Sequence, residues 1–314
     1  TGTSDRVGLV FARSASQPTR GDLTMASFDP ARLGFSTACF ARTSLPRALE
    51  LGSAMGFRTL ELLAFDGYCH SQGPLSGFYF EHMTGAERDE LRELVSGFDY
   101  LSTHAPFIEI CPLSPNPSVR ETAQRQLEIA VESAAFLGAS TTTTHVVPRF
   151  GCELADFRQE LTDLYRRLGD QAAAAGVTVT IETGYPVPVE QFAEVVWDID
   201  HPAVGANVDV GHLRGAIPAD LRGTPEGAAG YNDLLEAHVR SLGTKLLHFH
   251  LHDINPDTLR DHRAAGRGFL DYPRLFQTAA EIGYDGLFVF ELEEPDLEQA
   301  LRDSRTTILK AMAQ

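Results

Sequence analysis

Eight short apolar runs alternate with amphipathic stretches from residue 33 almost to the end of the chain. Such alternation predicts right-handed βαβ units and a parallel sheet. Eight units in about 280 residues fit a closed (β/α)8 barrel better than an open doubly wound sheet, and no GxGxxG motif opens the first unit. We therefore expect an α/β fold, a single TIM barrel. The strands are expected at 33–38, 58–63, 99–104, 140–147, 177–183, 204–210, 246–252 and 286–292, and the helices near 44–56, 86–98, 118–137, 153–175, 189–199, 222–242, 271–283 and 295–312.

Local signals support these helices. Thr84 and Glu87 form the capping-box pattern before the second helix, and Gly176 follows the alanine run of the fourth as a stop residue. The longer connections, at 64–84 and 105–117, come after strands. In a barrel those connections form the C-terminal face, where the active site lies.

The first 24 residues differ from the rest of the chain. They are rich in Ser, Thr, Arg and Gly, and Met25 follows them. We expect 1–24 to be a flexible N-terminal extension and 25–314 to be the barrel catalytic domain; an ordinary N-terminal arm is the alternative.

Composition narrows the class of partner. The 314 residues carry a net charge of −17, which disfavours nucleic acid because its binding depends on Lys and Arg neutralising phosphates. No apolar run approaches the roughly 18 residues of a membrane span, and the four cysteines form no CxxC pair. We expect a cytoplasmic protein whose partner is a small molecule or a metal cation, without nucleic acid or membrane; a homo-oligomer is left open.

Metal-competent side chains stand near the end of each predicted strand from the second onward. They are Glu61, His104, His145, Glu182, Asp209 with His212, His250 with His248 and His252, and Glu291. Because strand side chains alternate between faces, the apolar neighbours of Glu182 and Glu291 place these two carboxylates inside the barrel mouth.

Converging carboxylates in a dry interior are costly unless a cation compensates them. Mixed carboxylate and imidazole ligands suit Mn, Zn, Co or Fe better than Ca, with Mg also possible. Each residue also has an ordinary structural interpretation. Glu61 would face solvent or a helix end, His248 and His252 would fill barrel layers or the rim, and His201 and His238 would be solvated.

The strand ends resemble the sugar phosphate isomerase/epimerase family of xylose isomerase-like TIM barrels. The similar segments are Ile181-Glu182, Val208-Asp209-Val210-Gly211-His212, His250-Leu251-His252-Asp253, Phe290-Glu291, His104-Ala105-Pro106, and Asp261-His262 followed by Gly266-Arg267-Gly268. The resemblance implies a divalent metal held by Glu182, Asp209, His250 and Glu291. It also implies that the two glutamates are the acid/base pair.

Endonuclease IV belongs to the same superfamily, and its three-metal site uses more histidines. The matching residues here are His104, His145, Glu182, Asp209, His212, His250, His262 and Glu291. Arg260 stands where the resemblance implies an aspartate, which argues against a third metal. A second metal or a substrate contact at His104, His145 or His262 is left open.

The ligand set favours an isomerase or epimerase of a sugar or keto-polyol. A metal would stabilise the enediolate formed when a proton next to a carbonyl is removed, with Glu182 and Glu291 as catalytic acid and base and His212 as a partner of the metal site or of a substrate hydroxyl. A lyase that acts as a dehydratase on a related keto-polyol is the first alternative. A phosphodiester hydrolase of the endonuclease IV type is the second.

Two further groups bear on the substrate. Aromatic residues on the long connections are candidates for an apolar wall, with packing among themselves as the alternative: Phe65, Tyr68, Phe78, Phe80 and Phe107. Arginines on the rim are candidates for binding phosphate or carboxylate, with solvation as the alternative: Arg149, Arg214, Arg260, Arg263 and Arg267.

Overall fold

The computed structural model describes residues 28–314, and the predicted extension at 1–24 lies outside the described residues. Eight parallel strands close into a barrel in the order β1-β10-β9-β8-β7-β6-β5-β2, as the sequence predicts. Each strand lies within a predicted range and is one to four residues shorter than it. The barrel strands are β1 (Leu33–Ser36), β2 (Thr59–Leu63), β5 (Tyr100–His104), β6 (Thr141–Thr144), β7 (Thr178–Glu182), β8 (Val204–Asp209), β9 (Leu246–Leu251) and β10 (Leu287–Phe290).

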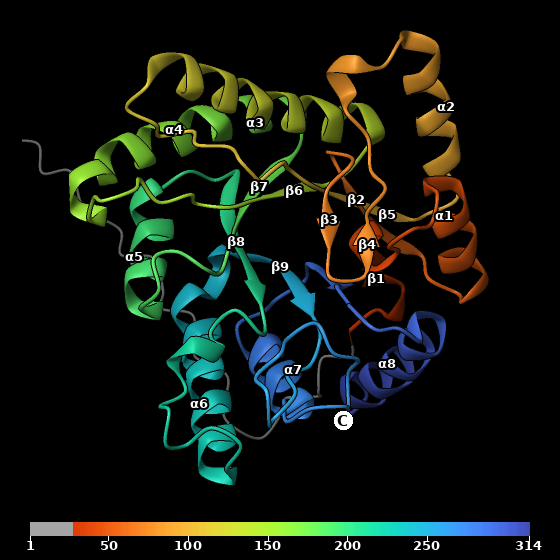
Figure 1. The fold of residues 1–314 in the computed structure, drawn as a ribbon, viewed down its shortest axis with the longest axis vertical. Helices are drawn as coiled ribbons and strands as arrows, with labels where there is room; N and C mark the ends of the chain where they lie inside the picture. The colour runs from red at the N-terminus through yellow and green to blue at the C-terminus, as the bar shows by residue number, and fades with distance from the viewer. Residues whose placement is uncertain (1–27) are drawn as a thin grey trace, which may run out of the picture.

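The connection after β2 contains a small antiparallel hairpin that the sequence analysis missed. Its strands are β3 (Cys69–His70) and β4 (Gly73–Pro74), and Leu75 N donates to Tyr68 O at 2.8 Å. Strands of two residues are too short to show the alternation by which a strand is recognised. The hairpin lies in front of the barrel strands in Figure 1 and forms part of the pocket wall described below.

Eight helices surround the strands (Figure 1). They are α1 (Leu45–Ala54), α2 (Gly85–Val95), α3 (Pro117–Leu137), α4 (Leu154–Ala175), α5 (Val189–Ile199), α6 (Pro225–Leu242), α7 (Tyr272–Glu281) and α8 (Leu297–Met312). The predicted capping box is present, because Thr84 N donates to Glu87 Oε2 at 2.7 Å and Glu87 N donates to Thr84 Oγ1 at 3.3 Å. Gly176 ends α4 with φ near 72°, a backbone angle that glycine adopts readily.

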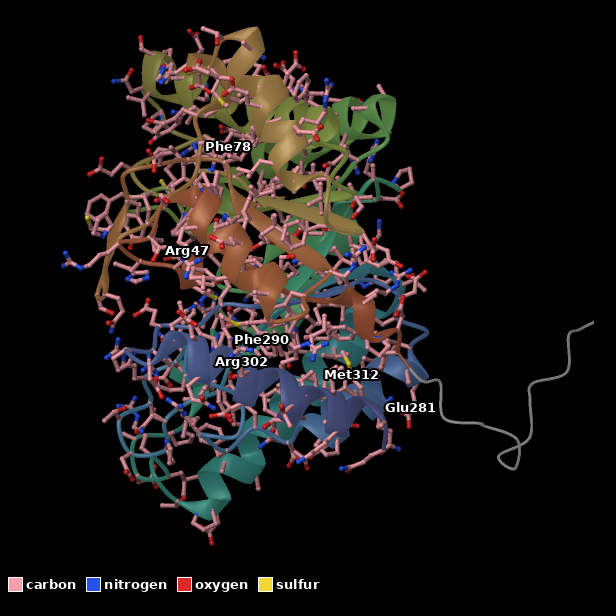
Figure 2. All side chains as sticks on the ribbon, turned by 90° about the vertical axis from the view of Figure 1, so that its right-hand side faces the viewer. Arg47, Phe78, Glu281, Phe290, Arg302 and Met312 are labelled. Carbon is pink, nitrogen blue, oxygen red and sulfur yellow. The ribbon has the colours of Figure 1, made fainter. Side chains whose placement is uncertain are left out.

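The outer faces of the strands carry the apolar core. Phe288 and Phe290 are fully buried on the helix side of β10, where Phe288 packs on Phe276 with ring centroids 5.0 Å apart. In Figure 2, Arg302 and Met312 mark α8, which covers this side of the barrel near Phe290. Among residues 28–314, none of the helices is long and apolar enough to cross a membrane.

The inside of the barrel is polar, although branched apolar residues usually dominate such interiors. Thr143 Oγ1 lies 3.1 Å from Thr180 Oγ1, and Ser102 Oγ donates to Glu61 Oε2 at 3.0 Å. Asn207 lies on the same inner face, next to a register shift between Ala206 and Asn207 where β8 pairs with β9. These polar layers support the side chains at the barrel mouth.

Candidate metal centre

Glu182, Asp209, His250 and Glu291 converge at the C-terminal ends of four consecutive barrel strands. Glu182 and Asp209 are the last residues of β7 and β8, His250 lies one residue before the end of β9, and Glu291 follows β10. One ligand atom from each lies within 4.8 Å of the other three. Two ligands on opposite sides of an ion at 2.0–2.3 Å are roughly 4.0–4.6 Å apart, so the spacing is close to that of a shared ion.

The Nδ1 atom of His250 shows what this cluster lacks. It is buried and has no hydrogen-bond partner in the described part of the chain. It lies 3.4 Å from Glu182 Oε2 and 3.5 Å from Glu291 Oε2. A buried polar atom without a partner is costly, and a divalent cation between this nitrogen and the two carboxylates would remove the cost. The residues present therefore fit a metal ion.

Three carboxylates of the centre have pKa values below their ordinary range. Burial acts to raise the pKa of Glu182, but the charges of His145 and His250 and the hydrogen bond from His104 lower it well below that range. Burial opposes ionisation of Asp209 too, and the charges of His212 and His252 outweigh it and lower its pKa. The carboxylates are therefore ionised at neutral pH.

Glu291 behaves in the same way, since burial acts to raise its pKa while the charge of His250 and the nearby imidazole of His262 lower it. The effect on His250 is reciprocal. Burial acts to lower its pKa, and the charges of Glu291, Glu182 and Glu61 raise it well above the ordinary range. Without a metal the cluster is held together by protonated imidazole, and this is the positive charge that a bound cation would replace.

His104 and His145 form a second group around Glu182. His104 Nδ1 donates to Ala105 O at 2.8 Å, so its Nε2 faces the site. That Nε2 lies 3.2 Å from both Glu182 Oε2 and His145 Nε2, and His145 Nε2 lies 3.2 Å from Glu182 Oε2. Three electron-pair donors so close together need a shared proton or a cation.

His262 lies apart from that pair, although all three were grouped from the sequence. Its Nδ1 lies 3.3 Å from Asp261 Oδ1 and its Nε2 lies 3.7 Å from Glu291 Oε2. Its ring stacks on His252 with centroids 4.3 Å apart. His212 Nδ1 donates to Thr183 O at 2.8 Å, so its Nε2 is turned away from that carbonyl, and the residue lines the pocket.

Known proteins resemble this chain over most of its length. The model of the xylose isomerase-like TIM barrel family matches residues 49–311. The chain belongs to this family. An uncharacterized protein of Methanocaldococcus jannaschii is 26% identical over 282 residues, which cover 86% of each chain.

Two solved structures share the fold of this family member. D-psicose 3-epimerase with D-tagatose from Clostridium cellulolyticum H10 is 17% identical over 90% of this chain and 96% of its own, with a TM-score of 0.64. A xylose isomerase-like TIM barrel protein from Mycobacterium smegmatis in complex with magnesium is 17% identical over 85% and 87%, with a TM-score of 0.62.

In this xylose isomerase-like barrel a pocket of about 200 Å³ opens above the centre. Phe65, Tyr68 and Phe107 line one side of it, as the sequence suggested for an apolar wall. Phe78 and Phe80 do not, because both are buried in the main core instead. Glu182, Glu291, His104, His145, His212 and His262 are exposed to the same space.

Two residues that support the centre were assigned ordinary roles from the sequence. His252 lies at 2.9 and 3.0 Å from the two oxygens of Asp209 and accepts from His262 N at 3.0 Å, so it donates to Asp209 and orients it. Glu61 is fully buried and lies 3.1 Å from His250 Nε2. Of its two interpretations from the sequence, a metal-competent strand end or a residue that faces solvent or a helix end, the second is therefore wrong. The signal available in the sequence was the alternation of side chains along a strand. His252 lies on the same face of its strand as the predicted ligand His250, and Glu61 points inward like the side chains at neighbouring strand ends.

Proposed function

We propose that this chain is a divalent-metal-dependent isomerase or epimerase of a sugar or related keto-polyol. Glu182, Asp209, His250 and Glu291 would hold the metal, which could be Mn, Zn, Co, Mg or Fe. When bound, the cation would polarise a substrate carbonyl and stabilise the charge that develops on its oxygen. The expected cytoplasmic location and a homo-oligomer stay predictions.

The observation that carries this proposal is the placement of two ionised carboxylates close to one histidine nitrogen. Glu182 Oε2 and Glu291 Oε2 lie 3.4 and 3.5 Å from His250 Nδ1 and both residues line the pocket. One carboxylate would take the proton from the carbon next to the carbonyl. The other would return a proton to the opposite face of the same carbon, which gives epimerisation, or to the former carbonyl carbon, which gives isomerisation once a proton has moved between the two oxygens.

His212 and the aromatic wall would orient the substrate. With Nδ1 donated to Thr183 O, His212 would present Nε2, which lies 3.7 Å from Asp209 Oδ1, to a substrate hydroxyl. Phe65, Tyr68 and Phe107 cover the pocket from the other side and would exclude water from the deprotonated carbon. Solved structures with this fold include D-psicose 3-epimerase and L-ribulose 3-epimerase, so ketoses are the first compounds to test.

The test is solvent exchange. The metal-loaded protein is incubated with D-fructose or D-tagatose in deuterium oxide, and deuterium on carbon is followed by nuclear magnetic resonance. We expect deuterium next to the carbonyl together with an epimer or isomer, and neither after metal removal by a chelator. Exchange with loss of water would favour the lyase. No exchange in any ketose or keto-polyol tested would reject proton abstraction.

A metal-dependent phosphodiester hydrolase is the second candidate, and one observation favours it. The atoms His104 Nε2, His145 Nε2 and Glu182 Oε2 are mutually 3.2 Å apart, a spacing that suits a second ion. Elemental analysis of the purified protein distinguishes the two candidates. About one metal per chain favours the isomerase, and two metals with cleavage of abasic DNA would favour the hydrolase.

A further inference from the structure

The pocket above the metal centre has an acidic lining. Glu182, Glu291 and Glu293 all face it, and its basic groups are histidines. Among residues 28–314, no lysine or arginine lines this pocket. A ligand that carries a phosphate usually meets Arg or Lys, whose fixed charges compensate the anion. The positive charge that the lining can carry is therefore on histidines, and those closest to the centre are already paired with its carboxylates, as His104 is with Glu182 and His262 with Asp261.

The rim arginines that the sequence offered as anion ligands already have acidic partners. Each has a nitrogen close to a carboxylate oxygen of this same chain. The pairs are Arg149 with Glu160 (2.6 Å), Arg260 with Glu293 (3.2 Å), Arg263 with Glu294 (3.0 Å), Arg267 with Asp296 (2.7 Å), and Arg214 with Asp261. A phosphate that binds any of them would therefore compete with a carboxylate that already compensates the charge of that arginine.

Backbone N–H groups at the usual place for an anion in this fold are already occupied in the loop after β9. In TIM barrels, phosphate often binds the loops after the seventh and eighth strands, which here are β9 and β10. In the loop after β9, the N–H groups of Ile254 and Gly266 donate to the Asp253 carboxylate at 2.9 Å, and that of Leu270 donates at 3.2 Å. A side chain at Gly268 would overlap Asp253 Oδ1. These N–H groups form an anion cradle that is already filled by a carboxylate of the protein itself.

The remaining wall suits the apolar face of an uncharged ligand. Phe107 packs edge-on against Phe65 and Tyr68, with ring centroids 5.6 and 6.1 Å apart. The pocket volume of about 200 Å³ lies below the roughly 300 Å³ at which sites for drug-sized ligands begin. A molecule of about one sugar unit fits that space.

We propose that the pocket selects an uncharged, unphosphorylated polyhydroxy ketone of about one sugar unit and excludes the phosphate esters of the same sugars. The inference rests on the proposed function. It adds the charge class of the substrate. The selection is imposed by the carboxylates that neutralise the rim arginines, and by Glu293 above all.

The test compares D-fructose with D-fructose 6-phosphate, and D-tagatose with its 6-phosphate, on the metal-loaded protein. Binding is measured by calorimetry, and turnover by deuterium exchange. We expect the free ketose to bind more tightly and its kcat/KM to be about 100-fold higher or more, because like charges brought together at a binding site are strongly unfavourable.

Binding separates this inference from the proposed function. If the free ketose binds better and neither compound exchanges, the proposed function fails while the inference stands. Tighter binding or faster exchange of the phosphate ester would overturn the inference, and so would a failure of every uncharged ketose in the panel to bind.

A variant tests the cause of the selection. Glu293→Gln removes one of the three carboxylates that face the pocket and releases Arg260 from its ion pair. The preference for the free ketose should therefore fall by about tenfold. Glu298→Gln removes the same charge from an exposed position on α8 outside this pocket, and it should leave the preference unchanged. Equal preferences in the two variants would show that Glu293 does not exclude the phosphate.

Discussion

His238 on α6 is fully buried and His262 at the barrel mouth is mostly buried, but different groups face them. His238 Nε2 lies 3.0 Å from Thr183 Oγ1, and its ring packs against Phe192 with centroids 5.3 Å apart. Burial lowers the pKa of His238 to about 4. Burial acts on His262 in the same direction, yet the nearby carboxylates of Asp261 and Glu291, 3.3 and 3.7 Å from its ring nitrogens, outweigh it and raise the pKa of His262 to about 10.

The difference shows which feature marks the functional region. Burial by itself gives a neutral histidine that fills space between a helix and the sheet. Carboxylates convert the same side chain into a cation, and several such pairs at the end of one barrel form a centre whose positive charge a metal could supply instead. The converging carboxylates, rather than the histidines, therefore distinguish the mouth from the rest of the core. The predictions below change either the carboxylates or the isolated histidine.

The largest effect is expected from removing a catalytic carboxylate at the mouth. Glu182→Gln and Glu291→Gln keep the shape and an acceptor oxygen but cannot carry a proton at neutral pH. We expect turnover to fall about 10²–10⁴-fold and to stay low at saturating metal, because general acid–base catalysis contributes about that much. Rates are measured against metal concentration by the deuterium-exchange assay.

Asp209→Asn is the matched control, since Asp209 is proposed to be a ligand only. It should lose metal affinity, and excess metal should restore much of its activity. Recovery of near-wild-type rates by both glutamine variants at saturating metal would show that the base lies elsewhere, with His212 or His145 next to be tested.

The second prediction concerns stability and the isolated histidine. Because the pKa of His238 in the folded protein, about 4, lies below the ordinary value of about 6.5, protonation favours the unfolded state. Its contribution is fully present above pH 6.5 and is lost as pH falls toward 4. By pH 5 the loss should be about 2 kcal/mol of unfolding free energy.

The measurement is chemical denaturation of the wild type and of His238→Gln at pH 7, 6 and 5. Other groups titrate over this range, so the quantity of interest is the difference between the two proteins. The stability advantage of the wild type should shrink toward pH 5. A difference that stays constant over this range would mean that His238 is not the isolated, neutral histidine of the comparison.

The sequence predicted the barrel because hydrophobic periodicity is a local property. It also placed Glu182, Asp209, His250 and Glu291 near one another, since strand parity and a shared barrel end are enough for that. His238 was expected to be solvated, which is wrong. Helical spacing would have predicted its burial. On the buried face of α6, residues recur at intervals of four, three and four, namely Tyr231, Leu235, His238 and Leu242.

Local patterns could not identify the partners of Glu61. Its neighbours Leu60 and Leu62 indicate that it points inward, but His248 and His250 lie on β9, far along the chain. That they face Glu61 across the barrel depends on strand order and register, which periodicity does not give. The closed anion cradle around Asp253 was hidden for a similar reason, because it is made of backbone N–H groups of a loop with no repeating pattern.

The smallest expected effect comes from Glu61, whose carboxylate lies beneath His250 in the barrel. This partner distinguishes His250 from His238, which faces Thr183 and Phe192. Glu61 Oε1 lies 3.1 Å from His250 Nε2, and Glu61 Oε2 lies 3.0 Å from His248 Nε2. A carboxylate this close favours a proton on Nε2, although Asn207 Nδ2 also lies 3.0 Å from that nitrogen; a proton there would leave Nδ1 of His250 for a metal and make it a better ligand. In Glu61→Gln we expect metal affinity to fall about 10–100-fold, the range found when such outer partners are replaced.

Metal dissociation constants are measured by competition with a chelator, after thermal unfolding has shown that the variant folds. Ser102→Ala is the control, because it removes the hydrogen bond that Ser102 Oγ donates to Glu61 at 3.0 Å and keeps the charge contact between Glu61 and His250. It should change affinity by less than about threefold, well below the effect of losing the charged partner. If Glu61→Gln weakened metal binding no more than Ser102→Ala does, the carboxylate beneath His250 would only fill space in the barrel. The contrast between the two kinds of buried histidine would then rest on Glu182 and Glu291 alone.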